Sequence, residues 1–146
     1  MGKPDKKIRF NEQQIKDFFM QQADIDFVLI FGSTALRRET PLSDMDIAVY
    51  FKKEDDVLRL GEQQIDITCA MMKICKINRV DVVVLNCANP FLRYQVIKYG
   101  RLIYARDLRV FYKFKAVSLG RYQDIKPMYE LYDKVAEINL RRGMHG

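Results

Sequence analysis

Histidine is almost absent from this sequence, and cysteine is scarce. The single histidine, His145, is the second-last residue, and chain ends are commonly disordered. The lack of any other histidine argues against histidine-bound zinc and against a serine–histidine–aspartate triad. Cys69, Cys75 and Cys87 are odd in number and lack the paired spacing of a metal site. We therefore expect free thiols that pack as small hydrophobic side chains.

Long apolar runs are also missing. No run reaches the roughly 18 residues that a membrane-spanning helix needs, and the first residues lack the apolar core of a secretory signal. These absences predict a cytoplasmic protein without a membrane span. A chain of 146 residues has the size of one domain and can bury a core.

A glycine–serine pair follows the first predicted strand. Val28–Phe31 is apolar and rich in β-branched residues, which is typical of a buried strand. Gly32 comes directly after it, and a residue without Cβ lets a ligand approach the backbone. The residues after Ser33 suit the first turn of a short helix over 33–38, and a helix start offers free N–H groups to phosphate. We therefore predict that Gly32 and Ser33 bind phosphate.

Three aspartates come next in the pattern. Ten residues lie between Ser33 and Asp44, and Asp44 and Asp46 stand at the start of a predicted strand over 45–51. Alternate side chains of a strand share a face, so the two aspartates point the same way. The residues that then point toward a core are Met45, Ile47 and Val49. Asp81 opens a third predicted strand; if this strand pairs with the second, Asp81 lies about 5 Å from the aspartate pair.

Carboxylates this close repel one another and need a compensating charge. Mg²⁺ takes oxygen ligands and substrate phosphates, and two such ions can clamp the attacking and leaving oxygens of an in-line displacement. We expect Asp44 and Asp46 to hold Mg²⁺. Asp81 either bridges metal or accepts the proton of the attacking hydroxyl.

The combination of Gly32-Ser33, Asp44-Met45-Asp46 and Asp81 resembles the nucleotidyltransferase (polymerase beta-like) superfamily. Within it, the sequence is similar to the minimal nucleotidyltransferases that are paired with HEPN-domain toxins. The likeness runs from about Val28 to Tyr104, and its last part, Gly100–Tyr104, looks like the Gly-x-x-Leu/Ile-Tyr segment that closes this family's sheet.

One stretch departs from the family pattern. The family commonly has Gly-Ser-x-Ala-Arg-Gly after the first strand, whereas this chain has Leu36 and Arg37 where Arg and Gly are usual. Arg37 or Arg38 can supply the missing charge from a shifted position, so both are candidate nucleotide-binding residues.

The resemblance implies an α/β (α+β) fold, in which helices flank a small mixed sheet of about four strands and further helices follow. It implies a nucleotidyltransferase domain over residues 1–106 and a C-terminal helical extension of the same domain over residues 107–146. It also implies transfer of AMP from ATP, with Mg²⁺, to a tyrosine hydroxyl of a HEPN toxin, which makes the protein an antitoxin. Two alternatives stay open: neutralisation of the partner by binding alone, and nucleotide transfer to a small molecule or RNA.

Charge and tyrosine gather in the C-terminal third. Residues 1–92 carry 13 basic and 14 acidic residues, a net charge of −1, whereas residues 93–146 carry 12 and 5, a net charge of +7. Seven of the eight tyrosines lie in the second segment. Basic residues interleaved with aromatic ones can bind nucleic acid. The other interpretation is a pair of amphipathic helices with a buried aromatic face.

Capping residues predict the helix limits. We expect the first helix to begin at Asn11, a second over 54–76, and a third from Asn89-Pro90 to Gly100. Strands are expected over 79–86 and 102–104. Asp107 then caps a helix that ends near Gly120, and Asp124 caps a last one.

The last predicted helix carries an apolar stripe at helical spacing. Its members are Ile125, Met128, Tyr132, Val135 and Ile138. Such a stripe packs on the domain's own sheet, or it forms an interface with a second copy or with a toxin.

Overall fold

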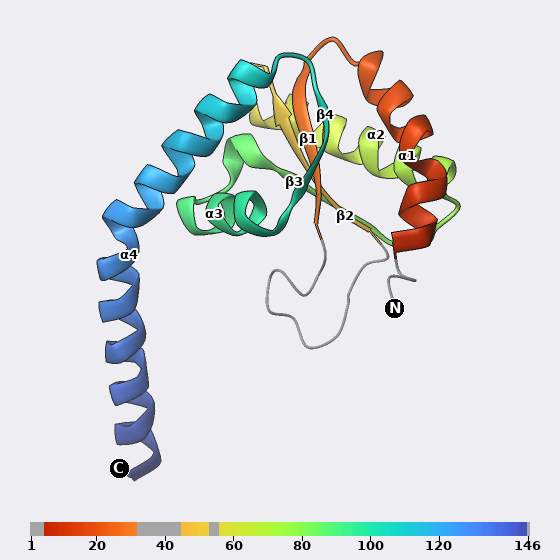
Figure 1. The fold of residues 1–146 in the computed structure, drawn as a ribbon. Coiled ribbons are helices and arrows are strands. Elements are labelled where there is room, and N and C mark those ends of the chain that lie inside the picture. The colour runs from red at the N-terminus through yellow and green to blue at the C-terminus, as the bar shows by residue number, and fades with distance from the viewer. Residues whose placement is uncertain (1–4, 32–44, 53–55, 146) are drawn as a thin grey trace.

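One mixed β-sheet lies at the centre of the molecule (Figure 1). The computed structural model describes residues 5–31, 45–52 and 56–145. In chain order, the described elements are α1 (Asp5–Met20), β1 (Ile25–Phe31), β2 (Met45–Phe51), α2 (Val57–Cys75), β3 (Val80–Val84), the short 3-10 helix η2 (Leu85–Cys87), α3 (Pro90–Tyr99), β4 (Arg101–Ala105) and α4 (Leu108–His145). None of these helices combines the length and apolar character that a membrane crossing requires.

The sheet has the strand order β3-β2-β1-β4. β1 is antiparallel to both β2 and β4, whereas β2 and β3 are parallel. A parallel pair needs a long crossover, and α2 provides it. The expected fold class, a small mixed sheet flanked by helices, is therefore confirmed.

Helices cover both faces of the sheet (Figure 1). On one face, α1 and α2 pack against a core that includes Ile15, Phe19, Ile47, Val49 and Met71. On the other face, α3 and the start of α4 pack against a second core that includes Phe27, Leu29, Ala48, Val96 and Phe114. Because both faces are covered, β1 and β2 are almost continuously apolar rather than alternating.

Side-chain caps begin two of the helices; α3 begins where the sequence predicts, whereas α2 begins at Val57 rather than at residue 54. The Asp56 side chain accepts hydrogen bonds from the backbone N–H groups of Leu58 and Arg59 at the start of α2. At the start of α3, the Asn89 side chain accepts a hydrogen bond of 2.8 Å from the Leu92 N–H, and Gly100 follows the last turn. The predicted limits of α3 are confirmed.

Two other limits differ from the prediction. α1 begins at Asp5 rather than at Asn11, so Asn11 lies inside the helix. The third strand ends at Val84 rather than near residue 86. At this end of the strand pair, the Asn86 side chain takes the place of strand backbone. It accepts a hydrogen bond from the Phe51 N–H and donates one to the Phe51 carbonyl, both at 2.8 Å.

The largest difference lies in the C-terminal segment. Instead of two helices separated near Gly120, a single helix of 38 residues, α4, runs from Leu108 to His145 with Pro127 inside it. A helix-interior glycine costs about 1 kcal/mol and a proline about 3 kcal/mol. The i,i+4 ion pairs Lys126–Glu130 and Glu137–Arg141 lie across or beyond these positions and support the helix. Gly120, near which the sequence predicts a helix end, and Pro127 therefore do not end this helix.

Candidate active site

Two of the three predicted carboxylates lie side by side in the sheet. β2 and β3 pair in parallel with Asp46 directly opposite Asp81. Paired positions on neighbouring strands have Cα atoms about 5 Å apart. The conditional prediction that the third strand pairs with the second is confirmed.

Both carboxylates point to the same face of the sheet. Residues that share a register position in a parallel pair lie on one face, and the next pair on that face, Ala48 and Val83, packs in the core under α3 and α4. The predicted inward residues Met45, Ile47 and Val49 all lie in the opposite core, under α1 and α2. Asp46 and Asp81 therefore belong to the face that α3 and α4 cover.

Asp46 is deeply buried although it is charged. Only 2% of its surface is exposed, and its partner in β1 is Phe31, the residue just before Gly32. Asp81 is half-buried beside it. The C-terminal end of β1 thus lies beside the start of β2. The predicted site needs this arrangement, because it combines the residues that follow Phe31 with Asp46.

Arg79 is a residue at this edge that the sequence analysis did not single out. Its carbonyl accepts a hydrogen bond of 3.3 Å from the Met45 N–H, which joins the starts of β2 and β3. A basic residue two positions before an aspartate is a weak signal in a sequence. The strand pairing brings the Arg79 backbone beside the start of β2.

The remaining predicted site residues lie outside the described part of the chain. These are Gly32, Ser33, Arg37, Arg38 and Asp44, together with the predicted helix over 33–38. Within the described ranges, no group of three His, Cys, Asp or Glu side chains comes together. The structure therefore describes two of the three predicted metal ligands.

The carboxylate pair fits a divalent cation. Asp46 and Asp81 bring hard oxygen donors to neighbouring positions on one face, and Mg²⁺ is commonly bound by one or two carboxylates plus substrate phosphates. A metal ion would also offset the repulsion between two adjacent negative charges, one of which is buried. This is the donor chemistry that metal-assisted phosphoryl transfer uses.

Arg93 links the helices on the carboxylate face. It donates hydrogen bonds to the Leu85 and Asn86 carbonyls at 3.0 and 3.1 Å, and its guanidinium lies 5.1 Å from the centre of the Phe114 ring. Burial lowers the pKa of Arg93, and the two carbonyls and the ring offset the cost of burying its charge. The contacts join η2, α3 and α4 into one layer.

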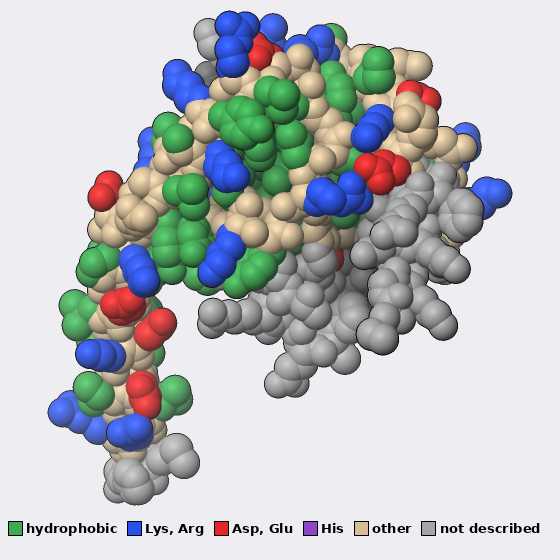
Figure 2. All heavy atoms as spheres, viewed as in Figure 1, with side chains coloured by type: hydrophobic (Ala, Val, Ile, Leu, Met, Phe, Trp, Pro, Cys, Tyr) green, Lys and Arg blue, Asp and Glu red, His purple; other side chains and the backbone are tan. Residues whose placement is uncertain are grey.

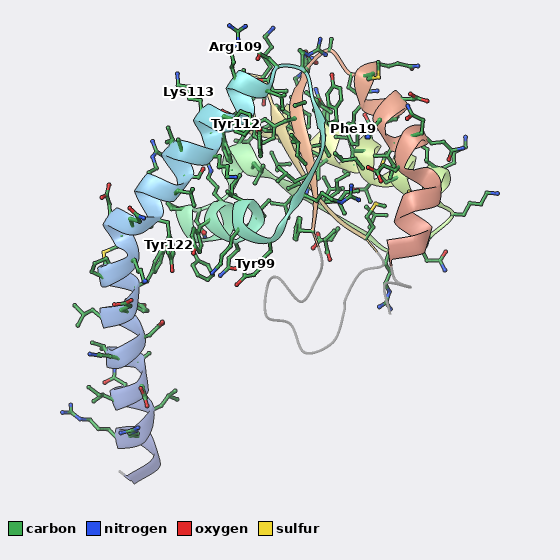
Figure 3. The ribbon with its side chains drawn as sticks, viewed as in Figure 1. Phe19, Tyr99, Arg109, Tyr112, Lys113 and Tyr122 are labelled. Atoms are coloured by element: carbon green, nitrogen blue, oxygen red, sulfur yellow. The ribbon has the colours of Figure 1, made fainter. Side chains whose placement is uncertain are left out.

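Aromatic packing accounts for much of the tyrosine in the C-terminal third. Tyr122 on α4 stacks on Tyr94 of α3 with ring centres 3.8 Å apart (Figure 3). Tyr129 contacts Phe91 at 5.8 Å, and Tyr104 stacks on Phe19 in the other core. A cleft of about 560 Å³ beside this cluster mixes Lys98 and Lys126 with acidic residues. These contacts favour helix packing over a basic nucleic-acid surface.

The comparison with protein families decides the identity of the fold. Residues 13–109 match the polymerase beta nucleotidyltransferase family. The chain belongs to this family. The matched range covers both Asp46 and Asp81, so the side-by-side aspartates lie inside the nucleotidyltransferase domain.

Solved nucleotidyltransferases have a similar fold. A chain in the structure of a tri-AMPylated Shewanella oneidensis HEPN toxin in complex with MNT antitoxin matches with a TM-score of 0.63 and 22% identity, over 88% of this chain and 98% of that chain. A chain of a toxin–antitoxin structure with AMP-PNP matches with a TM-score of 0.64 and 23% identity, over 86% and 98%. At these identities the likeness shows the fold. No curated protein matches the sequence.

Proposed function

We propose that this nucleotidyltransferase moves AMP from ATP to a hydroxyl group of a HEPN toxin and thereby acts as its antitoxin. The observation that carries the proposal is the register that sets Asp46 beside Asp81 inside the family-matched domain. One similar structure contains an AMPylated HEPN toxin, which supports a HEPN protein as the acceptor. Another contains AMP-PNP, which supports ATP as the nucleotide.

The proposed roles follow the chemistry of the residues. Gly32 and Ser33 hold phosphate, Arg37 or Arg38 adds positive charge, and Asp44 and Asp46 hold Mg²⁺, with Asp81 as a third ligand or as proton acceptor. A bound Mg²⁺ neutralises phosphate charge and stabilises the developing negative charge. We propose that residues 1–106 carry this chemistry and that residues 107–146 extend the same domain.

The transfer reaction balances without any further reactant. The acceptor hydroxyl oxygen, which we propose belongs to a tyrosine, attacks the α-phosphorus of ATP and forms a new P–O bond. The bond from that phosphorus to the bridging oxygen of the β-phosphate breaks, and pyrophosphate leaves. The hydroxyl proton passes to the Asp81 carboxylate, which lies beside Asp46 on the same face, or to solvent water if Asp81 is the third metal ligand.

The test is incubation of the protein with α-labelled ATP, Mg²⁺ and the HEPN protein encoded by the neighbouring gene. We expect label on the HEPN protein, loss of label when a chelator removes the metal, and at least a hundredfold lower rate for Asp46→Asn, roughly the scale for losing a group that acts as part of a catalytic unit. Asp66→Asn is the matched control, because Asp66 is an exposed aspartate on α2, over the other face. It should keep the wild-type rate.

Transfer by Asp46→Asn at the wild-type rate would contradict the catalytic role. A second experiment distinguishes neutralisation by binding alone from neutralisation by AMP transfer. It measures whether cells that express the toxin are rescued. If the Asp44→Ala/Asp46→Ala variant rescues fully, contact is sufficient; if it binds the toxin without rescue, the chemistry is required.

A further inference from the structure

The C-terminal half of α4 carries apolar side chains that nothing in the described structure covers. The helix leaves the body and extends well past it (Figure 1), and hydrophobic side chains continue along it (Figure 2). Met128 is 63% exposed, Tyr132 75% and Leu140 70%. The apolar stripe of the last predicted helix therefore does not pack on the domain's own sheet. The interpretation that it does so is wrong, and the interpretation as an interface stays open.

The apolar face is too broad for pairing with one helix. At 3.6 residues per turn, the apolar side chains between residues 125 and 140 span roughly 200° of the helix circumference. They are Ile125, Met128, Leu131, Tyr132, Val135, Ala136, Ile138 and Leu140. A two-helix coiled coil uses only a narrow seam, whereas a helix that lies in a groove between two helices is covered from both sides.

The remaining arc of the helix suits solvent. Four of its charged side chains pair along the helix itself, with Lys126–Glu130 at 3.9 Å and Glu137–Arg141 at 2.8 Å. These exposed pairs need no charged partner. The uncovered face is therefore apolar. A partner that covers it is expected to present an apolar surface.

The direction of this half-helix is set by the body. The line of α4 that packs inward, with Phe111, Phe114 and Ser118 buried, continues through Tyr122 and Tyr129, which pack on α3. At the helical period, the same line reaches Tyr132 and the residues after it. The free face is thus a continuation of an inward-packing face.

The half-helix also lies on the side of the sheet to which the carboxylates point. Asp46 and Asp81 lie on the face covered by α3 and α4. The strand ends that carry them and the projecting half of α4 both lie toward the bottom of Figure 1. A protein bound along the half-helix would therefore stand on the catalytic side of the domain.

We infer that residues 125–140 of α4 are a docking arm that seats in an apolar groove between two helices of the AMP acceptor protein and brings its hydroxyl toward Asp46 and Asp81. The inference rests on the proposed function, since the acceptor is the proposed toxin. A second copy is a poorer occupant. Two arms about 24 Å long that pair with each other through a two-helix seam leave part of each broad apolar face uncovered.

Two matched triple variants test the arm. Met128→Ser/Tyr132→Ser/Val135→Ser removes apolar side chains, and Lys126→Ser/Asp133→Ser/Lys134→Ser places three serines in the same turns on the polar arc. Circular dichroism checks that both stay helical. The measurements are affinity for the neighbouring-gene HEPN protein, affinity for ATP with Mg²⁺, and the rate of AMP transfer.

We expect the apolar variant to bind the HEPN protein at least about tenfold more weakly, as hot-spot removal does. The HEPN concentration for half-maximal transfer should rise by a similar factor, with ATP affinity and the saturated rate unchanged. The polar-arc variant should stay within about twofold of wild type. Unchanged HEPN binding by the apolar variant would overturn the inference, as would a wild-type homodimer that only this variant breaks.

The experiment separates the arm from the chemistry. Weaker binding by the apolar variant supports the arm even if the wild-type protein transfers no AMP, a result that would contradict the proposed function alone. Wild-type protein that does not bind the HEPN protein at all would overturn the arm.

Discussion

At the scale of single residues, Gly100 shows how one position combines local and tertiary demands. It ends α3 by donating a hydrogen bond of 2.7 Å from its N–H to the Val96 carbonyl, and it precedes β4. A Cβ at this position would clash with the same Val96 oxygen and come within 3.2 Å of the Leu29 side chain. The glycine of the Gly-x-x-Leu/Ile-Tyr segment is therefore required by packing.

Replacing Gly100 by alanine should destabilise the protein by about 1–3 kcal/mol, the usual cost of forcing atoms into a packed region. The measurement is the free energy of unfolding in urea. The control is Gly61→Ala in α2, where an added Cβ meets no atom within 4 Å. It should stabilise by up to about 1 kcal/mol, because alanine is the better helix former. Equal stability of the two variants would contradict this account.

At the scale of elements, α4 is the helix that the sequence describes least well. Proline lacks the N–H that would bond the carbonyl four residues earlier, and its ring crowds that carbonyl. Figure 1 shows that α4 changes direction midway along its length, and an internal proline such as Pro127 is a common cause of such a kink. The docking arm thus points where packing on α3 and this kink together direct it.

Pro127→Ala should straighten and strengthen the middle of α4. Removing the proline should add up to about 3 kcal/mol of local helix stability, so amide hydrogen exchange in residues 121–130 should slow. Gln123→Ala, at an exposed position of the same segment, should leave the exchange nearly unchanged. If the arm's direction matters, Pro127→Ala should also weaken HEPN binding, and a slower exchange without that loss would show that direction is unimportant.

At the scale of the whole molecule, an ion pair joins the N-terminal helix to the last strand. Arg101 of β4 lies 2.9 Å from the Glu12 carboxylate of α1, and Lys16 adds a second pair at 3.6 Å. The hydrogen bond from Arg101 is the main cause that lowers the pKa of Glu12 below its ordinary value of 4.5. Segments 89 positions apart are thus held together over the α1 side of the sheet.

This pair predicts a pH-dependent stability. A carboxyl whose pKa is lowered by folding stabilises the protein above its ordinary pKa and loses that contribution as the pH falls through the folded value. Glu12→Gln should therefore cost less than about 1 kcal/mol at neutral pH, because the pair is partly exposed. As the pH falls below 4.5 and through the lowered pKa of folded Glu12, the difference from wild type should shrink, because Glu12 becomes protonated. Thermal unfolding of both proteins across this range provides the measurement.

The sequence by itself determined the four strands and the face of its strand on which Asp46 lies, because those features depend on local patterns. The apolar runs predicted all four strands, and the cap Asn89 marked where α3 begins. Successive side chains of a strand point to opposite faces. Because Met45, Ile47 and Val49 were expected in one core, the sequence placed Asp46 on the opposite face of the sheet.

Only the tertiary structure decided which strands are neighbours and what α4 does. The pairing that sets Asp46 beside Asp81 joins residues 35 positions apart, and no local pattern encodes such a contact. Likewise, Gly120 and Pro127 are local signals for a helix end, yet the helix continues through both, and Tyr122 and Tyr129 on either side of Pro127 pack on α3. An apolar stripe has the same sequence whether it is buried or free, so only the path of the chain showed that this one is left uncovered.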